Sequence, residues 1–240
     1  IDDIMRIGWA FTGAGHLLKE SVDEFVKLAK DNSITVFMSN ASIEVLKMYG
    51  LYETVVKYTG GRYKELATDE NQKYSFPITG RLSLGKYDVL ILSPATANTV
   101  AKIVHGVSDT IVTNAVAQAG KGNVPTIVVP VDITPGDIDT VLPSKLELNK
   151  CKECDPCTAA LACPHNAFIP YKEISLLNCV GCGQCKISCQ YDAISEGKII
   201  QMHMRDIDIR NTEELRKIDE ITVLEHPSEI IPYIEDNISK

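Results

Sequence analysis

Apolar and polar residues are arranged over the first 145 positions in blocks that predict strands followed by helices. Four apolar runs, at 4–9, 34–38, 89–92 and 126–129, are predicted to be buried strands. Between residues 18 and 29, apolar residues recur at helical spacing with charged residues between them, which predicts an amphipathic helix. Strands that alternate with helices are typical of an α/β fold with a parallel sheet.

Three further helices are predicted in this part of the chain. One covers residues 41–49 and stops at Gly50, and another starts near Asn98. The last begins at Ser108, a residue type that caps helix N-termini well, and ends near Gly120. Each of these helices follows a predicted strand or another helix, as the α/β pattern requires.

The last 40 residues return to the same pattern after a cysteine-rich block. Residues 211–218 predict a capped helix, residues 221–224 a strand, and Pro227 the start of a helix that Pro232 interrupts. These elements are too few to fold alone, so we expect them to complete the first domain. Residues 133–150 contain two prolines and a glycine and indicate a connector. The expected organisation is a first domain at 1–145, an inserted module at 146–200 and a return segment at 201–240.

All eight cysteines lie in two similar runs within the inserted module. Each run has three cysteines at two-residue spacing and a fourth a little further on. The first three cysteines repeat at an offset of 28 residues, and the segment that starts at the fourth cysteine is similar in both runs, so the module is an internal duplication. The runs are Cys151, Cys154, Cys157 and Cys163, then Cys179, Cys182, Cys185 and Cys189.

This spacing is typical of a ferredoxin-like α+β module with two [4Fe–4S] clusters, in which each run supplies three ligands to one cluster and its fourth to the other. By that precedent, Cys189 completes the cluster of the first run and Cys163 that of the second. The first run has five residues before its last cysteine instead of three, and Gln190 replaces the usual proline, but neither change removes a ligand. Disulfides are disfavoured because the chain shows no secretory signal. Two zinc sites are the other alternative, although zinc ribbons use pairs of cysteines.

Composition narrows the classes of function. The net charge of −8 disfavours nucleic-acid binding, which needs clustered Lys and Arg. No apolar stretch approaches the roughly 20 residues that span a bilayer, so we expect no membrane segment. Exposed clusters and unpaired thiolates both favour a reducing cytoplasm. The 240 residues, 45% of them hydrophobic, can bury a sizeable core beside a small module.

Three small polar segments follow three of the predicted strands, at the sheet edge where open α/β folds bind ligands. The first and second, at 12–15 and 39–42, would let a phosphate approach the backbone and a helix N-terminus, although ordinary strand–helix connections have the same composition. The third covers residues 93–99 and is more specific. Its Pro94 fixes a turn, its small residues leave room for a flat ring, and its Asn98 donates and accepts hydrogen bonds.

The motifs Thr12-Gly-Ala-Gly15, Pro94-Ala-Thr-Ala-Asn-Thr99 and Gly106-Val-Ser-Asp109 resemble the flavin-containing cysteine decarboxylase superfamily. The resemblance covers residues 1–131 and, more loosely, 199–225. It implies a flavodoxin-like, Rossmann-type sheet that binds FMN, in a homo-oligomer built from trimers with the flavin near a subunit interface. The implied FMN-binding residues are Thr12, Gly13, Ala14, Gly15, Ser39, Asn40, Ala41, Ala95, Thr96, Ala97, Asn98, Thr99, Ser108 and Asp109.

One departure from that superfamily bears on the reaction. Decarboxylating members carry a histidine just before the strand that leads to the proline–asparagine motif, and this chain has Gly80 or Arg81 there. Decarboxylation is therefore disfavoured. A flavin domain joined to a two-cluster module instead resembles archaeal flavoproteins that accept electrons from ferredoxin and reduce 7,8-dihydromethanopterin to its tetrahydro form, the C1 carrier of methanogenesis.

That resemblance implies FMN and two [4Fe–4S] clusters as cofactors, reduced ferredoxin or a similar carrier as electron donor, and a pterin as substrate. The alternative is a flavoprotein that relays electrons between carriers without reducing a metabolite, and both hypotheses use the same cofactors. The catalytic residues stay unknown from the sequence. His16, Arg81 and His203 are candidates for contacts with phosphate or substrate, but helix packing, an exposed arginine and a core-filling segment explain them as well.

Overall fold

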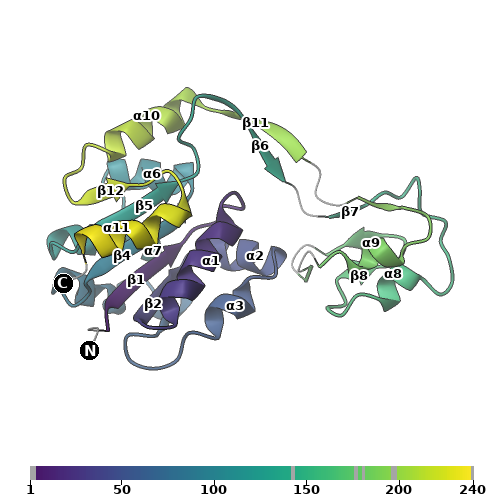
Figure 1. Ribbon diagram of the computed structural model, residues 1–240, viewed down its shortest axis with the longest axis horizontal. Coiled ribbons are helices and arrows are strands. Elements are labelled where there is room, and N and C mark those ends of the chain that lie inside the picture. Colours follow the sequence, from purple (N-terminus) through teal and green to yellow (C-terminus); the bar gives the residue numbers. More distant parts are fainter. Residues whose placement is uncertain (1–3, 142–143, 176–177, 180–181, 196–198, 239–240) are drawn as a thin grey trace. The chain divides into compact units, whose positions relative to one another are not determined.

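The computed structural model describes residues 4–141, 144–175, 178–179, 182–195 and 199–238 (Figure 1). It divides into two compact units. The sheet unit consists of Ile1–Ile43, Thr54–Gly136 and Met204–Lys240. The cysteine unit consists of Glu44–Glu53 and Asp137–His203, and it contains all eight cysteines.

The sheet unit is built on six strands in the order β12-β5-β4-β1-β2-β3. All the pairings between them are parallel. When the short edge strand β3 is set aside, the order is that of flavodoxin-like folds, and it reverses between β1 and β4. The strands are β1 (Arg6–Phe11), β2 (Ser33–Met38), β3 (Leu66–Thr68), β4 (Val89–Ala95), β5 (Thr126–Pro130) and β12 (Ile221–Val223). The predicted parallel α/β fold is thus confirmed.

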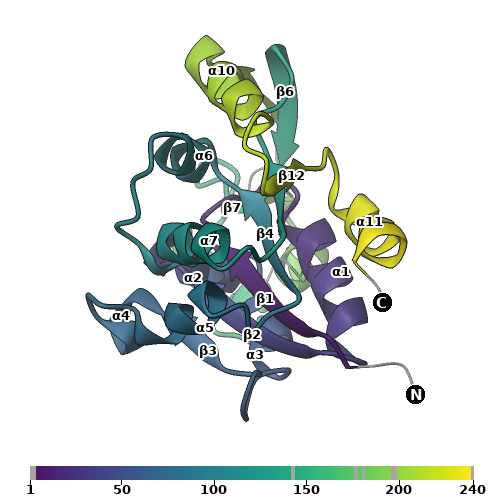
Figure 2. The same cartoon turned by 90° about the vertical axis from the view of Figure 1, so that its left-hand side faces the viewer.

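Helices cover both faces of this sheet (Figure 2). One face carries α1 and α11, and the other carries α5 and α7. The helices and 3-10 turns that lie wholly in this unit are α1 (Leu18–Ala29), α4 (Asp69–Gln72), η1 (Pro77–Thr79), α5 (Gly80–Ser83), α6 (Ala97–Val104), α7 (Ile111–Lys121), α10 (Asp206–Leu215), η2 (Pro227–Glu229) and α11 (Ile230–Asn237). Two further helices, α2 (Asn40–Met48) and α3 (Tyr52–Val56), are divided between the two units.

Coverage on both faces explains why the central strands are apolar along their whole length. Trp9 on β1 is fully buried, and its ring meets that of Phe25 on α1 edge-on, with centroids 5.5 Å apart. The neighbouring Ala10 points to the opposite face, where it belongs to a core cluster with Val112 and Val116 of α7. Trp9, the last residue of the apolar run predicted at 4–9, is thus a core residue.

Several predicted helix boundaries were wrong. The amphipathic helix predicted between residues 18 and 29 is an exception, because α1 covers Leu18–Ala29. Thr110, not Ser108, caps α7, because its hydroxyl accepts a hydrogen bond from the Thr113 N–H at 3.2 Å. The last helices also differ from expectation. Helix α10 begins at Asp206, so the expected start at residue 211 lies inside it.

Two other local expectations were corrected. Pro232 does not interrupt α11, because it lies in the first turn, where a backbone N–H has no partner within the helix. The expected connector at 133–150 contains strands β6 (Gly136–Val141) and β7 (Lys145–Leu146). Strand β6 pairs with β11 (Ile199–Met204), and β7 pairs antiparallel with β10 (Ile194–Ser195). Each of these strands pairs with a strand that is distant in sequence, so the local composition of residues 133–150 does not reveal it.

The rest of the cysteine unit is a small α+β module. Strands β8 (Phe168–Ile169) and β9 (Glu173–Ile174) form an antiparallel hairpin, and α8 (Thr158–Leu161) and α9 (Gln184–Ser188) contact each other. Its core is small and includes the cysteines themselves. The buried residues are Leu146, Ala159, Ala167, Phe168, Ile174, Cys179, Ala193 and Ile194.

Candidate functional site

The first and third loops lie side by side at the carboxyl edge of the sheet, because they follow β1 and β4, which are neighbours. The hydroxyl of Thr12 joins them. It donates to the Pro94 carbonyl at 2.7 Å and accepts from the Thr96 N–H at 3.0 Å. Thr12 is only 2% exposed, so both bonds are shielded from water. The two loops that flank the reversal of strand order are thereby fixed to each other.

Most of the third loop is regular structure. Strand β4 continues through Ala95, and α6 starts at Ala97, close to the predicted start near Asn98. Thr96 is the N-cap, with its hydroxyl accepting from the Thr99 N–H at 3.3 Å. Asn98 is exposed in the first turn of α6, so its amide is free of core packing. The loop thus presents a helix N-terminus and one exposed amide.

The first and second loops approach each other closely. A Cβ atom on Gly13 would lie 2.8 Å from the Cβ of Ala41, closer than side chains tolerate. Ser39 precedes α2 and accepts from the Ser42 N–H at 3.2 Å, while the Ser42 hydroxyl donates to the Ser39 carbonyl at 2.8 Å. Glycine is therefore required at position 13 for the backbone of the first loop to meet the start of α2.

Asp69 connects the second loop to α7 and was not anticipated from the sequence. Its carboxylate accepts from the Ile111 N–H at 2.7 Å and from the Asn40 N–H at 3.1 Å. It thus holds the N-termini of α2 and α7 together, an arrangement that helix dipoles favour. The available signal was its position directly after β3, a three-residue strand too short to be recognised from its apolar pattern.

Ser108 and Asp109, which the superfamily resemblance implied as neighbours of the flavin, lie in an exposed turn between α6 and α7. Both oxygens of Asp109 accept from the Lys102 ammonium at 2.8 Å, and this bond lowers the pKa of Asp109. The contacts of Asp109 are thus with α6. It is Ile111, two residues further on, that the structure links to the second loop, through Asp69.

A second carboxylate that the sequence reasoning missed is Asp132, which follows β5 at the same edge of the sheet. The Val131 N–H donates to the Ala95 carbonyl at 3.0 Å, and the Thr212 hydroxyl donates to the Asp132 carbonyl at 3.0 Å. Asp132 is half-buried. Burial and the nearby carboxylate of Asp208 raise the pKa of Asp132. The signal was a polar residue two positions after the end of a parallel strand, β5.

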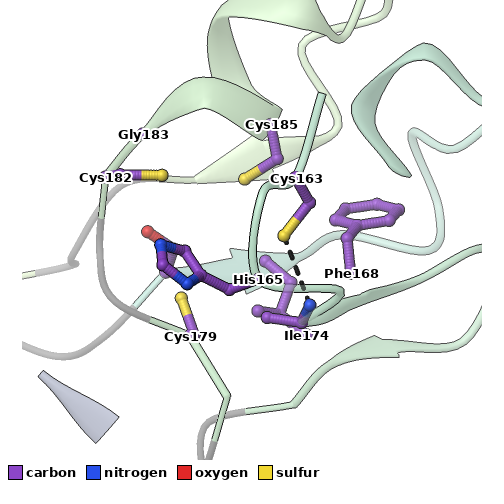
Figure 3. Close-up of a pocket in the computed structure, with 10 residues that line it drawn as sticks. Cys163, His165, Phe168, Ile174, Cys179, Cys182, Gly183 and Cys185 are labelled. Atoms are coloured by element: carbon purple, nitrogen blue, oxygen red, sulfur yellow. Dashed lines mark hydrogen bonds between the residues drawn. The ribbon is translucent and has the colours of Figure 1, made fainter. Parts of the chain in front are cut away.

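The eight thiols line two separate hollows of the cysteine unit. Cys163 of the first run lies with Cys179, Cys182 and Cys185 of the second run, beside Phe168 and Ile174 (Figure 3). The other hollow joins the first three cysteines of the first run to the last cysteine of the second. Its cysteines are Cys151, Cys154, Cys157 and Cys189. The structure therefore brings together the two sets of four that the ferredoxin precedent specifies.

The backbone shows why each fourth cysteine lies near the other run. The Glu147 N–H, just before the first run, donates to the Ala193 carbonyl at 2.8 Å, and the Ser175 N–H, just before the second run, donates to the Ala167 carbonyl at 2.8 Å. The two donor residues, Glu147 and Ser175, are 28 positions apart in sequence. The first three cysteines of the two runs are separated by the same 28 positions. Asn166 and Asp192 also adopt matching left-handed conformations, with φ of 51° and 50°. The duplication in sequence is thus a duplication in structure.

The surroundings of Cys163 suit a thiolate ligand. The Ala167 N–H donates to its sulfur at 3.2 Å. Burial opposes ionisation of this thiol, but the backbone N–H groups of residues 165–168 outweigh it and lower the pKa of Cys163. Hydrogen bonds to sulfur are also a means by which proteins set cluster potentials. In the described part of the chain, no three His, Cys, Asp or Glu side chains are arranged to hold a single metal ion.

Arg81 and His203 have partners of their own. The Arg81 guanidinium pairs with Glu65 at 2.8 Å and lies 5.0 Å from the centroid of the Tyr63 ring. His203 is exposed and lies 2.9 Å from an oxygen of Asp137 on the paired strand β6. His16 is half-buried in the turn before α1. Of these three candidates, His16 is the one that belongs to a loop at the carboxyl edge of the sheet.

Comparison with known proteins agrees with both parts of the site. Residues 2–166 match the family model described as Flavoprotein, and residues 173–195 match that of the 4Fe-4S binding domain. The fold and the site define a flavoprotein that carries an iron–sulfur module, and the chain belongs to the flavoprotein family. Within this family it is similar over nearly its whole length to proteins named dihydromethanopterin reductase (acceptor).

Two relatives of that name match nearly end to end. The protein from Methanosarcina mazei is 44% identical over 234 residues, which cover 94% of this chain and 97% of the relative. The protein from Methanocaldococcus jannaschii is 48% identical over 236 residues, 95% of each chain. Burkholderia xenovorans DmrB in complex with FMN, described as a cubic protein cage for redox transfer, superposes with a TM-score of 0.64 at 25% identity over 100% of this chain and 98% of DmrB. Among the described residues, no helix is long and apolar enough to cross a membrane.

Proposed function

We propose that this chain is an iron–sulfur flavoprotein reductase that converts dihydromethanopterin to tetrahydromethanopterin. Single electrons enter from a ferredoxin-type donor, pass through two [4Fe–4S] clusters and collect on FMN. The observation that carries the proposal is the presence, in one chain, of two hollows lined by four cysteines each and a set of ligand-binding loops at the reversal of strand order. The two relatives named as this reductase support the choice of substrate.

Each set of four cysteines would hold one cluster. The apolar walls of the hollows, Phe168 and Ile174 in one and Leu146 in the other, would limit the access of water to the clusters. The N–H groups around Cys163 would stabilise the charge of its thiolate. A cluster accepts and returns one electron at a time, which suits a donor of the ferredoxin type.

The three loops would hold FMN. Gly13, Ala14, Gly15 and Ser39 would contact its phosphate end, where the close approach of the first loop and α2 leaves no room for side chains on Gly13. Ala95 to Thr99 would line the ring, with Thr12 fixing these loops to one another. Bound FMN supplies the conversion of single electrons into a hydride. The chain's own contribution would be to hold the ring, the substrate and a proton source in positions where they can react.

We also propose that the chain assembles into homo-oligomers built from trimers. The support is the relation to DmrB, a protein described as a cubic cage, together with the trimeric arrangement implied by the superfamily resemblance. Sedimentation of the protein with its cofactors bound tests this, because a monomer of 26.4 kDa is easily told from a trimer or a larger assembly.

An anaerobic single turnover tests the proposed reaction. The protein is reduced, excess reductant is removed, and dihydromethanopterin is added while flavin and cluster absorbance are followed, with dihydrofolate as comparison. Reoxidation accompanied by formation of tetrahydromethanopterin supports the reductase. Rapid reoxidation by a small redox carrier, with none by either pterin, would instead establish an electron relay.

Asn98→Ala is expected to weaken FMN binding about 3- to 10-fold, the loss of one hydrogen bond of about 1 kcal/mol. Asn98 is exposed, so the change removes no core packing and the unfolding midpoint should stay the same. Fluorescence titration of the FMN-depleted protein measures the dissociation constant. Asn149→Ala, an exposed amide in the cysteine unit, serves as the matched control. Unchanged FMN affinity in Asn98→Ala would refute the placement of this loop against the ring.

A further inference from the structure

Asp132 and Asp208 form a pair of carboxyl groups with opposite surroundings. Asp208 is 7% exposed and receives two hydrogen bonds from the Arg205 guanidinium, at 2.6 Å and 2.8 Å. Among the described residues, no guanidinium forms such a bidentate pair with Asp132, and the charge of Asp208 raises its pKa. A pair of carboxyl groups in different environments is the arrangement by which active sites separate an acid from a carboxylate.

The position of Asp132 places it among the loops of the flavin site. It follows β5, whose last residue, Pro130, pairs with Ala95 of the third loop. The backbone N–H of Ala97, the first residue of α6, and the side chain of His16, just after the first loop, each lower the pKa of Asp132 in part. The Thr212 hydroxyl, itself buried, anchors its backbone to α10. Asp132 is thus held between the first loop, the third loop and α10.

Reduction of an imine in a dihydropterin needs a proton as well as a hydride. The hydride carries both electrons to the carbon of the C=N bond and leaves the bound flavin oxidised, while the nitrogen must take a proton. We infer that the carboxylic acid of Asp132 donates this proton, is left as a carboxylate and regains a proton from water. The inference rests on the proposed pterin reduction and adds the residue that completes it.

Charges around Asp132 favour this role. The charged and titratable groups that act on it are Asp208 and Arg205 from α10 and His16 from the first loop. Burial is the largest effect and raises the pKa of Asp132, Asp208 raises it further, and the Ala97 N–H, His16 and Arg205 lower it in part. The net raised pKa keeps more of the acid form near neutral pH than an ordinary aspartate, with a pKa of about 3.9, would have.

The pH dependence follows from the sign of this shift. A proton donor works in its acid form, so the rate of pterin reduction is highest below the pKa of Asp132 and falls as the pH rises through it. Asp208→Asn removes the negative charge that raises this pKa, so the fall should begin at lower pH while the plateau rate is kept. If Asp132 had a purely structural role, Asp208→Asn would not change the pH at which the rate of pterin reduction falls.

Asp132→Asn keeps the shape of the side chain and removes the acid. The reduced variant should be reoxidised by dihydromethanopterin at least about 100-fold more slowly than the parent protein, as expected for the loss of a general acid. Its rate should also no longer fall as the pH rises through the range in which Asp132 ionises. Its FMN content and its reduction by dithionite should be unchanged. Asp23→Asn, an exposed aspartate on α1 paired with Lys19, is the control and should match the parent.

An infrared titration provides a readout that is independent of turnover. The difference between the parent protein and Asp132→Asn isolates the carboxylic acid band of Asp132, which should persist above the pH range of an ordinary aspartate and shift down in Asp208→Asn. Equal pterin rates in Asp132→Asn and the parent, or a band that disappears near pH 4, would overturn the inference. Failure of dihydromethanopterin to reoxidise the parent itself would instead overturn the proposed function.

Discussion

Cys163→Ala is expected to remove the cluster of the second run and to leave that of the first, although Cys163 belongs to the first run in sequence. The reason is geometric: Cys163 lines one hollow with Cys179, Cys182 and Cys185. Iron and acid-labile sulfide should each fall from about eight to about four per chain, the content of one [4Fe–4S] cluster. Chemical analysis of the anaerobically purified variant gives this count.

Comparison with three other variants shows which cluster is lost. After reduction, the electron paramagnetic resonance signal that remains in Cys163→Ala should match that of Cys182→Ala. The signal that remains in Cys189→Ala should match that of Cys154→Ala, because Cys189 lines the other hollow. If Cys163→Ala matches Cys154→Ala instead, each run holds its own cluster and the crossed assignment is refuted.

Thr12→Val is expected to destabilise the sheet unit by about 2–6 kcal/mol and to weaken FMN binding at least about 10-fold. Valine has the shape of threonine but cannot donate to the Pro94 carbonyl or accept from the Thr96 N–H. Both groups would be left without a partner in a buried site, which costs about 1–3 kcal/mol each. The first and third loops would also lose the link that fixes their spacing. Urea unfolding followed by circular dichroism, and FMN titration, measure the two effects.

Thr12→Ser separates the hydroxyl from the methyl group. Serine retains both hydrogen bonds and loses only buried methyl contacts, so FMN affinity should stay near that of the parent and stability should fall by about 1 kcal/mol. A Thr12→Val variant that binds FMN as tightly as Thr12→Ser would contradict a role for this hydroxyl in setting the loops. Loss of affinity in both variants would show that the methyl group matters instead.

The central strands could be predicted from the sequence because helices cover both faces of the sheet. Strands buried on both faces read as continuous apolar runs, and the observed β1, β2, β4 and β5 lie within a few residues of the expected ranges. Edge strand β3 has three residues, too few to give such a run. The α7 cap was misplaced by two residues because Ser108 and Thr110 are both good caps and only the fold selects between them.

The chemistry of the cysteines was likewise readable, since ligand type and spacing are local properties of the chain. The spacing specified two sets of four and the crossing between runs. The spacing could not specify which backbone contacts bring the fourth cysteine of each run to the other run. The hydrogen bonds of Glu147 to Ala193 and of Ser175 to Ala167 close a small α+β module around the thiols, and no local pattern encodes pairs so far apart.

The sequence by itself therefore determined the α/β class, the grouping of the cysteines into two sets of four, and the small polar loops after β1, β2 and β4. Each of these features depends on the residue pattern of a short stretch of chain. The tertiary structure decided which side chains meet at the carboxyl edge of the sheet. Asp69 joins the starts of α2 and α7, and Asp132 lies between three segments, one of them 80 residues away. The reason is physical: their roles depend on burial and on charges brought from other elements, and both exist only once the chain has folded.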